Sequence, residues 1–95
     1  MKKFELPVQS KPTEELIKRL SIMDTECLIN EVLRYKTIRE ANGITVKDVC
    51  IRSRMTWVYK LEGLGMLPTV STASRYIQTV IDCLATQEET NEKGL

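Results

Sequence analysis

Apolar residues recur at the spacing of an α-helix over most of the chain. The first such segment follows Thr13, whose hydroxyl can cap a helix. Two glutamates stand in the next turn, where negative charge favours the start of a helix. Its apolar positions fall on one face: Leu16, Ile17, Leu20 and Met23. Before it, Pro7 and Pro12 stand among polar residues, so residues 1–12 are expected to form an irregular arm.

A longer helix is predicted next. Asp24 or Thr25 offers its N-cap, and Asn42-Gly43 ends it because glycine accepts the backbone angles of a helix stop. Its apolar stripe is broad: Leu28, Ile29, Val32, Leu33, Tyr35 and Ile38. The stripe predicts that this helix is packed along most of its length.

Two short helices are predicted to follow. Thr45 can cap the first, over residues 46–52, whose inward positions are Val46, Val49 and Cys50. The second spans residues 54–62, and its apolar side chains fall three apart on one face: Met55, Val58 and Leu61. The opposite face of this second helix then presents Arg54, Thr56, Trp57, Tyr59 and Lys60.

A final helix begins after the Leu67-Pro68 break. Ser71 or Thr72 offers its N-cap, and the helix is expected to end near Thr86. Its apolar positions are Ala73, Ile77, Val80, Ile81 and Leu84. No alternating run is long enough to predict a strand, so the fold class is all-α with four to five helices. The polar residues 87–95 are expected to form a flexible tail.

Composition narrows the function classes. The 95 residues, 42% of them hydrophobic, suffice for one small folded domain but not for a substrate domain beside a cofactor domain. No apolar run approaches the length of a membrane span, and no export signal follows the first residues, so a cytoplasmic protein is expected.

The inventory of reactive side chains predicts neither an enzyme nor a metal or cofactor site. The chain has no histidine, the usual general base and zinc ligand. Its three cysteines, Cys27, Cys50 and Cys83, form no Cys-x-x-Cys pair. Each has apolar neighbours, which predicts small core residues in a reducing cytoplasm.

The net charge of +1 hides an uneven distribution. Residues 34–61 contain two acids, Glu40 and Asp48, against seven basic residues: Arg34, Lys36, Arg39, Lys47, Arg52, Arg54 and Lys60. The local balance is therefore 7 − 2 = +5, and the rest of the chain carries 7 − 11 = −4. Such a segment can attract a polyanion. The alternative is that these charges only solvate helix faces.

Short motifs at compatible spacing give a resemblance to a known family. They are Ile38-Arg39, Asn42-Gly43-Ile44-Thr45, Asp48-Val49-Cys50, Val58-Tyr59-Lys60-Leu61-Glu62, and Pro68-Thr69-Val70-Ser71-Thr72-Ala73 followed by Tyr76-Ile77 and Val80. With these motifs, the stretch from Leu33 to Leu84 resembles the lambda-repressor-like helix-turn-helix family, also called the Xre or Cro family. Its members include phage repressors, plasmid regulators and antitoxins.

The resemblance implies a helix-turn-helix domain over residues 33–86. Val49 and Cys50 would pack under a recognition helix whose amino end enters the major groove of DNA. Arg39 and Glu62 match a structural ion pair of the family. Residues 13–32 would be an additional N-terminal helical extension and a possible dimerisation element.

Three features depart from the family pattern. The interval from Cys50 to Val58 is about two residues shorter than usual. The turn has no glycine, and Arg54 stands where the alignment would place one. Val46 replaces the frequent glutamine at the start of the second helix of the motif. These differences all concern the DNA-facing part of the motif.

The predicted contacts to DNA divide into two classes. Base contacts are assigned to Arg54, Thr56, Trp57 and Lys60. Phosphate contacts are assigned to Thr45, Lys47 and Arg52, together with backbone amides at the start of their helix. For Trp57 and Tyr59, the alternatives are that the aromatic ring caps the core or contacts a protein.

The function expected from this interpretation is sequence-specific binding of double-stranded DNA by a transcriptional regulator. A homodimer that spans two half-sites and represses by occupying an operator is the leading hypothesis. The alternative is a protein-interaction module of the same fold, such as an antitoxin or adaptor that neutralises a partner protein.

Overall fold

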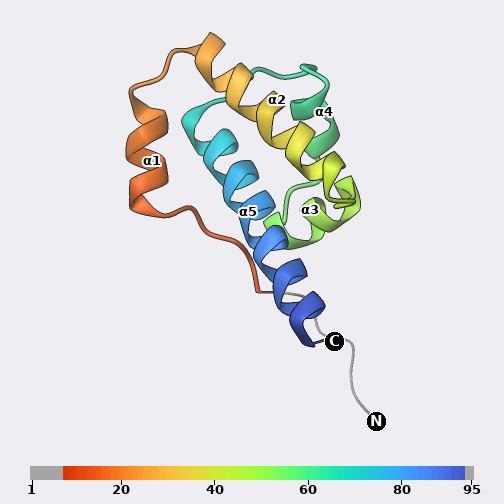
Figure 1. Cartoon of the computed structure of the whole chain (residues 1–95). Coiled ribbons are helices and arrows are strands. Elements are labelled where there is room, and N and C mark those ends of the chain that lie inside the picture. Colours follow the sequence, from red (N-terminus) through yellow and green to blue (C-terminus); the bar gives the residue numbers. More distant parts are fainter. Residues whose placement is uncertain (1–7, 94–95) are drawn as a thin grey trace.

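The structure, a computed structural model, describes residues 8–93 and the side chains of residues 8–87. Over this part of the chain it contains five helices: α1 (Glu14–Ser21), α2 (Thr25–Ala41), α3 (Val46–Ser53), α4 (Val58–Glu62) and α5 (Val70–Lys93) (Figure 1). No residue from 8 to 93 belongs to a strand, so the predicted all-α class is confirmed.

Side-chain caps explain where the first three helices begin. The Thr13 hydroxyl accepts from the Leu16 amide at 3.2 Å, and the Asp24 carboxylate accepts from the Cys27 amide at 2.8 Å. Asp24, rather than Thr25, is therefore the N-cap of α2. Thr45 caps α3 as predicted. Each cap satisfies an amide that has no partner within its own helix.

The segment 54–62 differs from the prediction, because only its second half is helical. Arg54 adopts a left-handed conformation, with φ 62°, and ends α3. The Ser53 hydroxyl then accepts from the Met55 amide at 3.2 Å, which turns the chain before α4 begins at Val58. Met55 still reaches the core from this turn. Met55 and Val58, three positions apart, are thus both buried although no continuous helix joins them.

Helix α5 begins earlier and ends later than predicted. Thr69, and not Ser71 or Thr72, caps it: the Thr72 amide donates to the Thr69 hydroxyl at 3.2 Å, and the Thr69 amide donates to the Thr72 hydroxyl at 2.9 Å. Instead of ending near Thr86, the helix continues to Lys93 through most of the predicted tail. That segment is polar, but glutamate, glutamine and lysine favour helices and no proline or glycine interrupts them. Residues 94–95 lie outside the described part.

Helix α5 lies at the centre and packs against α1, α2 and α3, while α4 packs against α2 and α3 (Figure 1). Residues 13–32 pack on the rest of the chain. Leu16 and Leu20 from α1, and Leu28 and Val32 from α2, belong to the same buried cluster as the side chains of α3, α4 and α5. Leu16 and Leu20 of α1 are therefore buried within their own chain.

Two apolar positions predicted to face inward lie at the surface instead. Ile17 is 39% exposed, and Ile81 is 37% exposed. Each lies at the edge of the apolar face of its helix, where the neighbouring helix no longer covers it. Their exposure leaves apolar surface on α1 and α5.

The described part of the N-terminal arm, residues 8–12, is irregular as predicted, but it is held in place. The Ser10 amide donates to the Arg52 carbonyl at 3.1 Å, and the Gln9 side-chain amide donates to the Ser53 carbonyl at 3.4 Å. The arm thereby satisfies carbonyl groups at the end of α3 that have no partner within the helix. Residues 1–7 lie outside the described part.

Candidate nucleic-acid interface

The candidate interface runs from α3 through the turn at residues 54–57 to α4. A capping box begins it: the Asp48 amide donates to the Thr45 hydroxyl, and the Thr45 amide donates to the Asp48 carboxylate, both at 3.0 Å. On the inner side, Val49 and Val58 are fully buried and Cys50 is half-buried. The two helices are therefore fixed to the core on one side and face solvent on the other.

A buried cluster of polar side chains holds the end of α4. The Arg39 guanidinium from α2 donates to both carboxylate oxygens of Glu62, at 2.7 and 2.9 Å, and to the Ile44 carbonyl at 2.7 Å. The structure thus contains the ion pair expected between Arg39 and Glu62. The Tyr76 hydroxyl from α5 also donates to Glu62, at 2.5 Å. The cluster joins α2, α4 and α5.

The electrostatics of this cluster favour one protonation state. Burial, followed by the hydrogen bond to the Glu62 carboxylate, raises the pKa of Tyr76 far above its ordinary value of 10.0. Burial lowers the pKa of Arg39, but Glu62 outweighs this effect and the pKa is raised overall. The arginine therefore stays charged and the phenol stays neutral, and the phenol donates to the carboxylate.

The residues predicted to contact bases do not share one helix face, because residues 54–57 form a turn. Arg54, Thr56 and Lys60 are exposed. Trp57 is half-buried against the core, so only part of its ring reaches the surface. Tyr59 is 60% exposed on α4 and does not cap the core. The exposed set therefore comes partly from the turn and partly from α4.

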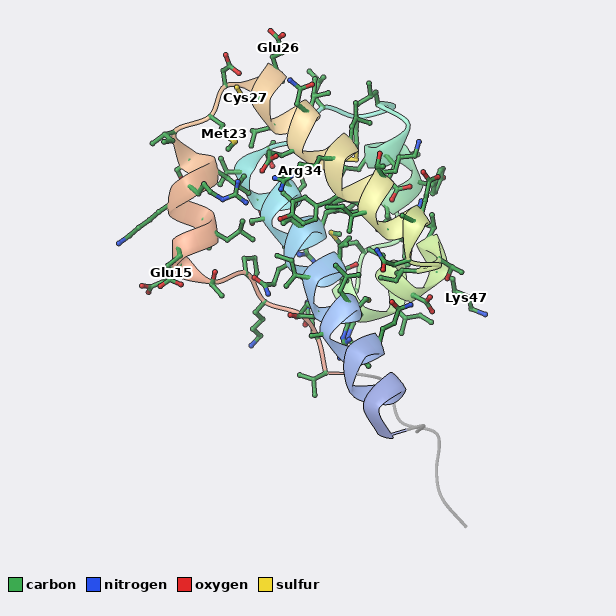
Figure 2. The ribbon with its side chains drawn as sticks, viewed as in Figure 1. Glu15, Met23, Glu26, Cys27, Arg34 and Lys47 are labelled. Carbon is green, nitrogen blue, oxygen red and sulfur yellow. The ribbon has the colours of Figure 1, made fainter. Side chains whose placement is uncertain are left out.

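The residues predicted to contact phosphates differ in how accessible they are. Lys47 is exposed and points away from the body of the molecule (Figure 2). The Thr45 hydroxyl is used in the capping box. The half-buried Arg52 donates through Nη1 to the Thr86 hydroxyl at 2.7 Å and to the Asp82 carbonyl at 3.2 Å. Arg52 thus ties α3 to α5, and of the two cations Lys47 is the accessible one.

The positive segment 34–61 consequently presents less charge than its sequence predicts. Arg39 is neutralised in the core by Glu62, which lies just outside the segment, and Arg52 is held by α5. On α3, the turn and α4, the exposed cations are Lys47, Arg54 and Lys60. Any electrostatic attraction of a polyanion to this unit depends mainly on these three.

Sequence reasoning missed two side chains that shape the site. Tyr76 appears only as part of a motif match, and nothing in the sequence shows that its hydroxyl reaches Glu62. Arg75 donates to the Ser53 carbonyl at 3.1 Å and thus fixes the end of α3 from α5. Both contacts join residues that are at least 14 positions apart. The helical period identifies which face these residues occupy but not their polar partners.

The cysteines are less buried than predicted. Cys27 is exposed in the first turn of α2 (Figure 2), and Cys50 and Cys83 are half-buried. The hydrogen bond with Asp24 raises the pKa of Cys27, and burial raises the pKa of Cys83. Both groups are therefore thiols, not thiolates, near neutral pH.

No family model matches the sequence, and no curated protein or solved structure does either. Between residues 8 and 93, no helix is long and apolar enough to cross a bilayer. Among the side chains of residues 8–87, no three histidine, cysteine, aspartate or glutamate groups lie so that they could hold a metal ion.

Proposed function

We propose that the protein is a sequence-specific DNA-binding transcriptional regulator with a lambda-repressor-like helix-turn-helix unit formed by α3, the turn and α4. Two observations support this proposal: the unit is locked to α2 and α5 by the buried Arg39–Glu62–Tyr76 cluster, and its outer side exposes Arg54 and Lys60. A rigid helical pair with cations on its outer side is what insertion into a major groove requires.

Arg54 carries the proposal. Its φ of 62° lies in the left-handed region, which glycine enters freely and which costs other residues about 1–2 kcal/mol. The position nevertheless holds a long cationic side chain that is exposed beside the start of α4. Its guanidinium donates to the Ile51 carbonyl at 3.2 Å, which helps to end α3. Arginine is the side chain that most often reads guanine in the major groove.

The proposed contacts follow from the chemistry of the exposed residues. Arg54 would read guanine through paired hydrogen bonds, and Lys60 would reach guanine or a phosphate. Thr56, or the exposed part of Trp57, would meet a thymine methyl group. Lys47 and the backbone amides at the start of α3 would bind phosphates and set the position of the unit on the duplex.

The regulator is proposed to act as a homodimer in the cytoplasm. One unit offers few base contacts, so specificity requires two units on half-sites about 34 Å apart. A dimer of the phage or plasmid type would occupy an operator and exclude other proteins from the promoter, and therefore repress. The proposed operator is palindromic, because the two copies are related by a two-fold axis.

Exposed apolar residues favour a second candidate function, a protein-interaction module such as an antitoxin or adaptor. Tyr59 on α4 is 60% exposed, and Leu64 and Leu67 in the following loop are 45% and 65% exposed. Apolar and aromatic side chains suit a protein partner better than a phosphate backbone. A complex formed through them would depend only weakly on salt.

Selection of bound sequences from a random duplex library at physiological salt tests the proposal. The expected result is a palindromic motif, which the variant Arg54→Gly enriches more weakly and with less preference at the guanine that Arg54 would read. Arg34→Gln is the matched control, because Arg34 pairs with Glu31 at 3.4 Å on α2 and lies outside the proposed unit. The wild-type protein enriching no sequence, or Arg54→Gly enriching the same motif equally well, would overturn the proposal.

A further inference from the structure

Helix α1 carries exposed residues of two kinds on one outward face. Glu14, Ile17, Lys18 and Ser21 recur at i, i+3, i+4 and i+7, and all four are exposed. The acidic residue stands in the first turn and the basic residue in the last turn, with an isoleucine between them. Arg19 is excluded from this face, because it is bound to Glu31 of α2 at 2.6 Å.

An open groove of about 370 Å³ adjoins this face, between α1 and the start of α5. Ile17, Pro12 and Val70 supply its apolar lining, and Ser71, Ser74 and Arg75 supply its polar edge. Pro12 and Val70 are half-buried, while Ile17 is 39% exposed. The groove thus offers apolar surface that no other side chain among residues 8–87 fills, and the partly exposed Ile17 forms one of its sides.

We propose that this face of α1 and the adjoining groove bind a second copy of the chain, with the two α1 helices antiparallel. Antiparallel pairing reverses the charge order of one helix relative to the other. It brings Glu14 of each copy against Lys18 of the other, and it places the two Ile17 side chains near the two-fold axis. The surface is therefore complementary to itself, as a symmetric dimer requires.

The position of α1 agrees with this role. In Figure 1 α1 lies at the edge of the molecule opposite α3 and α4, with α2 and α5 between them. A copy bound at α1 therefore leaves the proposed DNA-binding unit uncovered in both subunits. This inference deepens the proposed function, because a palindromic operator requires two copies.

The size of the surface sets the strength of the dimer. An eight-residue helix is only about 12 Å long, and stable interfaces bury at least about 1,200 Å² in total. Ile22, which directly follows α1 and is 88% exposed, adds apolar surface. The dimer is consequently weak in solution and is strengthened by adjacent half-sites on DNA.

Sedimentation equilibrium of charge-reversal variants, without DNA, tests the pairing. Glu14→Lys alone and Lys18→Glu alone each place like charges opposite one another, so each is expected to weaken self-association about threefold to tenfold. The double variant, and an equimolar mixture of the two single variants, restore opposite charges and dimerise like the wild type. Glu15→Lys is the matched control. Glu15 points outward from α1 (Figure 2), and as the neighbour of Glu14 it stands about 100° further around the helix, off this face, so its reversal leaves the dimer unchanged.

The apolar contact is tested separately with Ile17→Ser, which is expected to weaken the dimer by about tenfold or more. The protein should stay folded, because Ile17 is already exposed at the surface. Failure of the double variant and of the mixture to restore the dimer would overturn the inference, as would a wild type that stays monomeric at high concentration. These results need no DNA. A dimer that behaves as expected but binds no duplex would therefore reject the proposed function alone.

Discussion

Two arginines near the proposed DNA-binding unit occupy opposite environments. Arg39 is buried at the inner end of α4, where it donates to Glu62 and to the Ile44 carbonyl. Arg54 is exposed in the turn before α4, in a backbone conformation that glycine adopts more easily. The first arginine holds the unit in place, and the second is proposed to be presented by it. Substitution should therefore affect stability at one site and binding at the other.

This contrast has a physical basis in desolvation. A buried charge is stable only while its partner and hydrogen bonds are complete, because water cannot replace them. An exposed guanidinium does not depend on a single partner in this way, because water also solvates its charge. The inner cluster is thus expected to tolerate few changes, whereas Arg54 can be changed with little effect on folding.

The largest expected effect is that of Glu62→Ala. It leaves the Arg39 guanidinium buried without its carboxylate, which should lower the free energy of unfolding by about 3–5 kcal/mol. Glu40→Ala is the control, because Glu40 is an exposed carboxylate 3.7 Å from the same guanidinium and should contribute less than about 1 kcal/mol. Urea denaturation followed by circular dichroism measures both. Similar small losses in the two variants would contradict the account.

Tyr76→Phe removes one hydrogen bond from the same carboxylate and keeps the ring. The expected loss is about 1.5–3 kcal/mol, as for a buried hydrogen bond to a charged group. The raised pKa of Tyr76 also predicts a pH effect: the folded protein retains a proton that the unfolded chain releases near pH 10.0, so stability falls as the pH rises above that value. Denaturation at several pH values should show a smaller fall above pH 10 in the variant. Equal falls in both proteins would show that Tyr76 does not carry the effect.

Arg54→Gly should separate stability from binding. Glycine relieves the left-handed strain, so the free energy of unfolding should stay the same or rise by up to about 1 kcal/mol. Affinity for the selected duplex should fall by about 1–3 kcal/mol, the value of one good base contact. Arg54→Lys keeps the strain and the charge but not the paired donors, so its affinity should be intermediate. A glycine variant that unfolds more easily and binds as well as the wild type would assign Arg54 to helix capping alone.

Lys47→Ala is expected to have the smallest effect and a different signature. A phosphate contact carries no sequence information, so affinity for selected and unrelated duplexes should fall by the same factor. The slope of log affinity against log salt should decrease by about 1. Fluorescence anisotropy at several salt concentrations measures both quantities. A loss of affinity confined to the selected sequence would instead show that Lys47 contacts a base edge.

Local signals in the sequence predicted much of the fold. Thr13 and Thr45 cap helices as expected, because a cap depends only on residues within one turn. The helix stop at Asn42-Gly43 and the all-α class depend on similarly local rules. The Arg39–Glu62 pair was expected from the family resemblance, because a contact across 23 residues leaves no trace in the helical period.

The errors arise where tertiary contacts override the period. Met55 is buried through a turn, so its spacing to Val58 wrongly predicted a helix. The sequence also did not show that α5 provides oxygens that hold the Arg52 guanidinium. Tyr76 reaches Glu62 only because α4 and α5 converge at the core. Each outcome depends on how separate helices pack, which the order of residues along one helix does not encode.

The central claim is that α3, the turn and α4 bind duplex DNA through their exposed cations. The most direct test is a salt titration of duplex affinity for the wild type and for the double variant Arg54→Gly with Lys60→Ala. The account predicts steep salt dependence in the wild type, and a large loss of both affinity and slope in the double variant. Weak, salt-independent binding that is the same in the two proteins would contradict it.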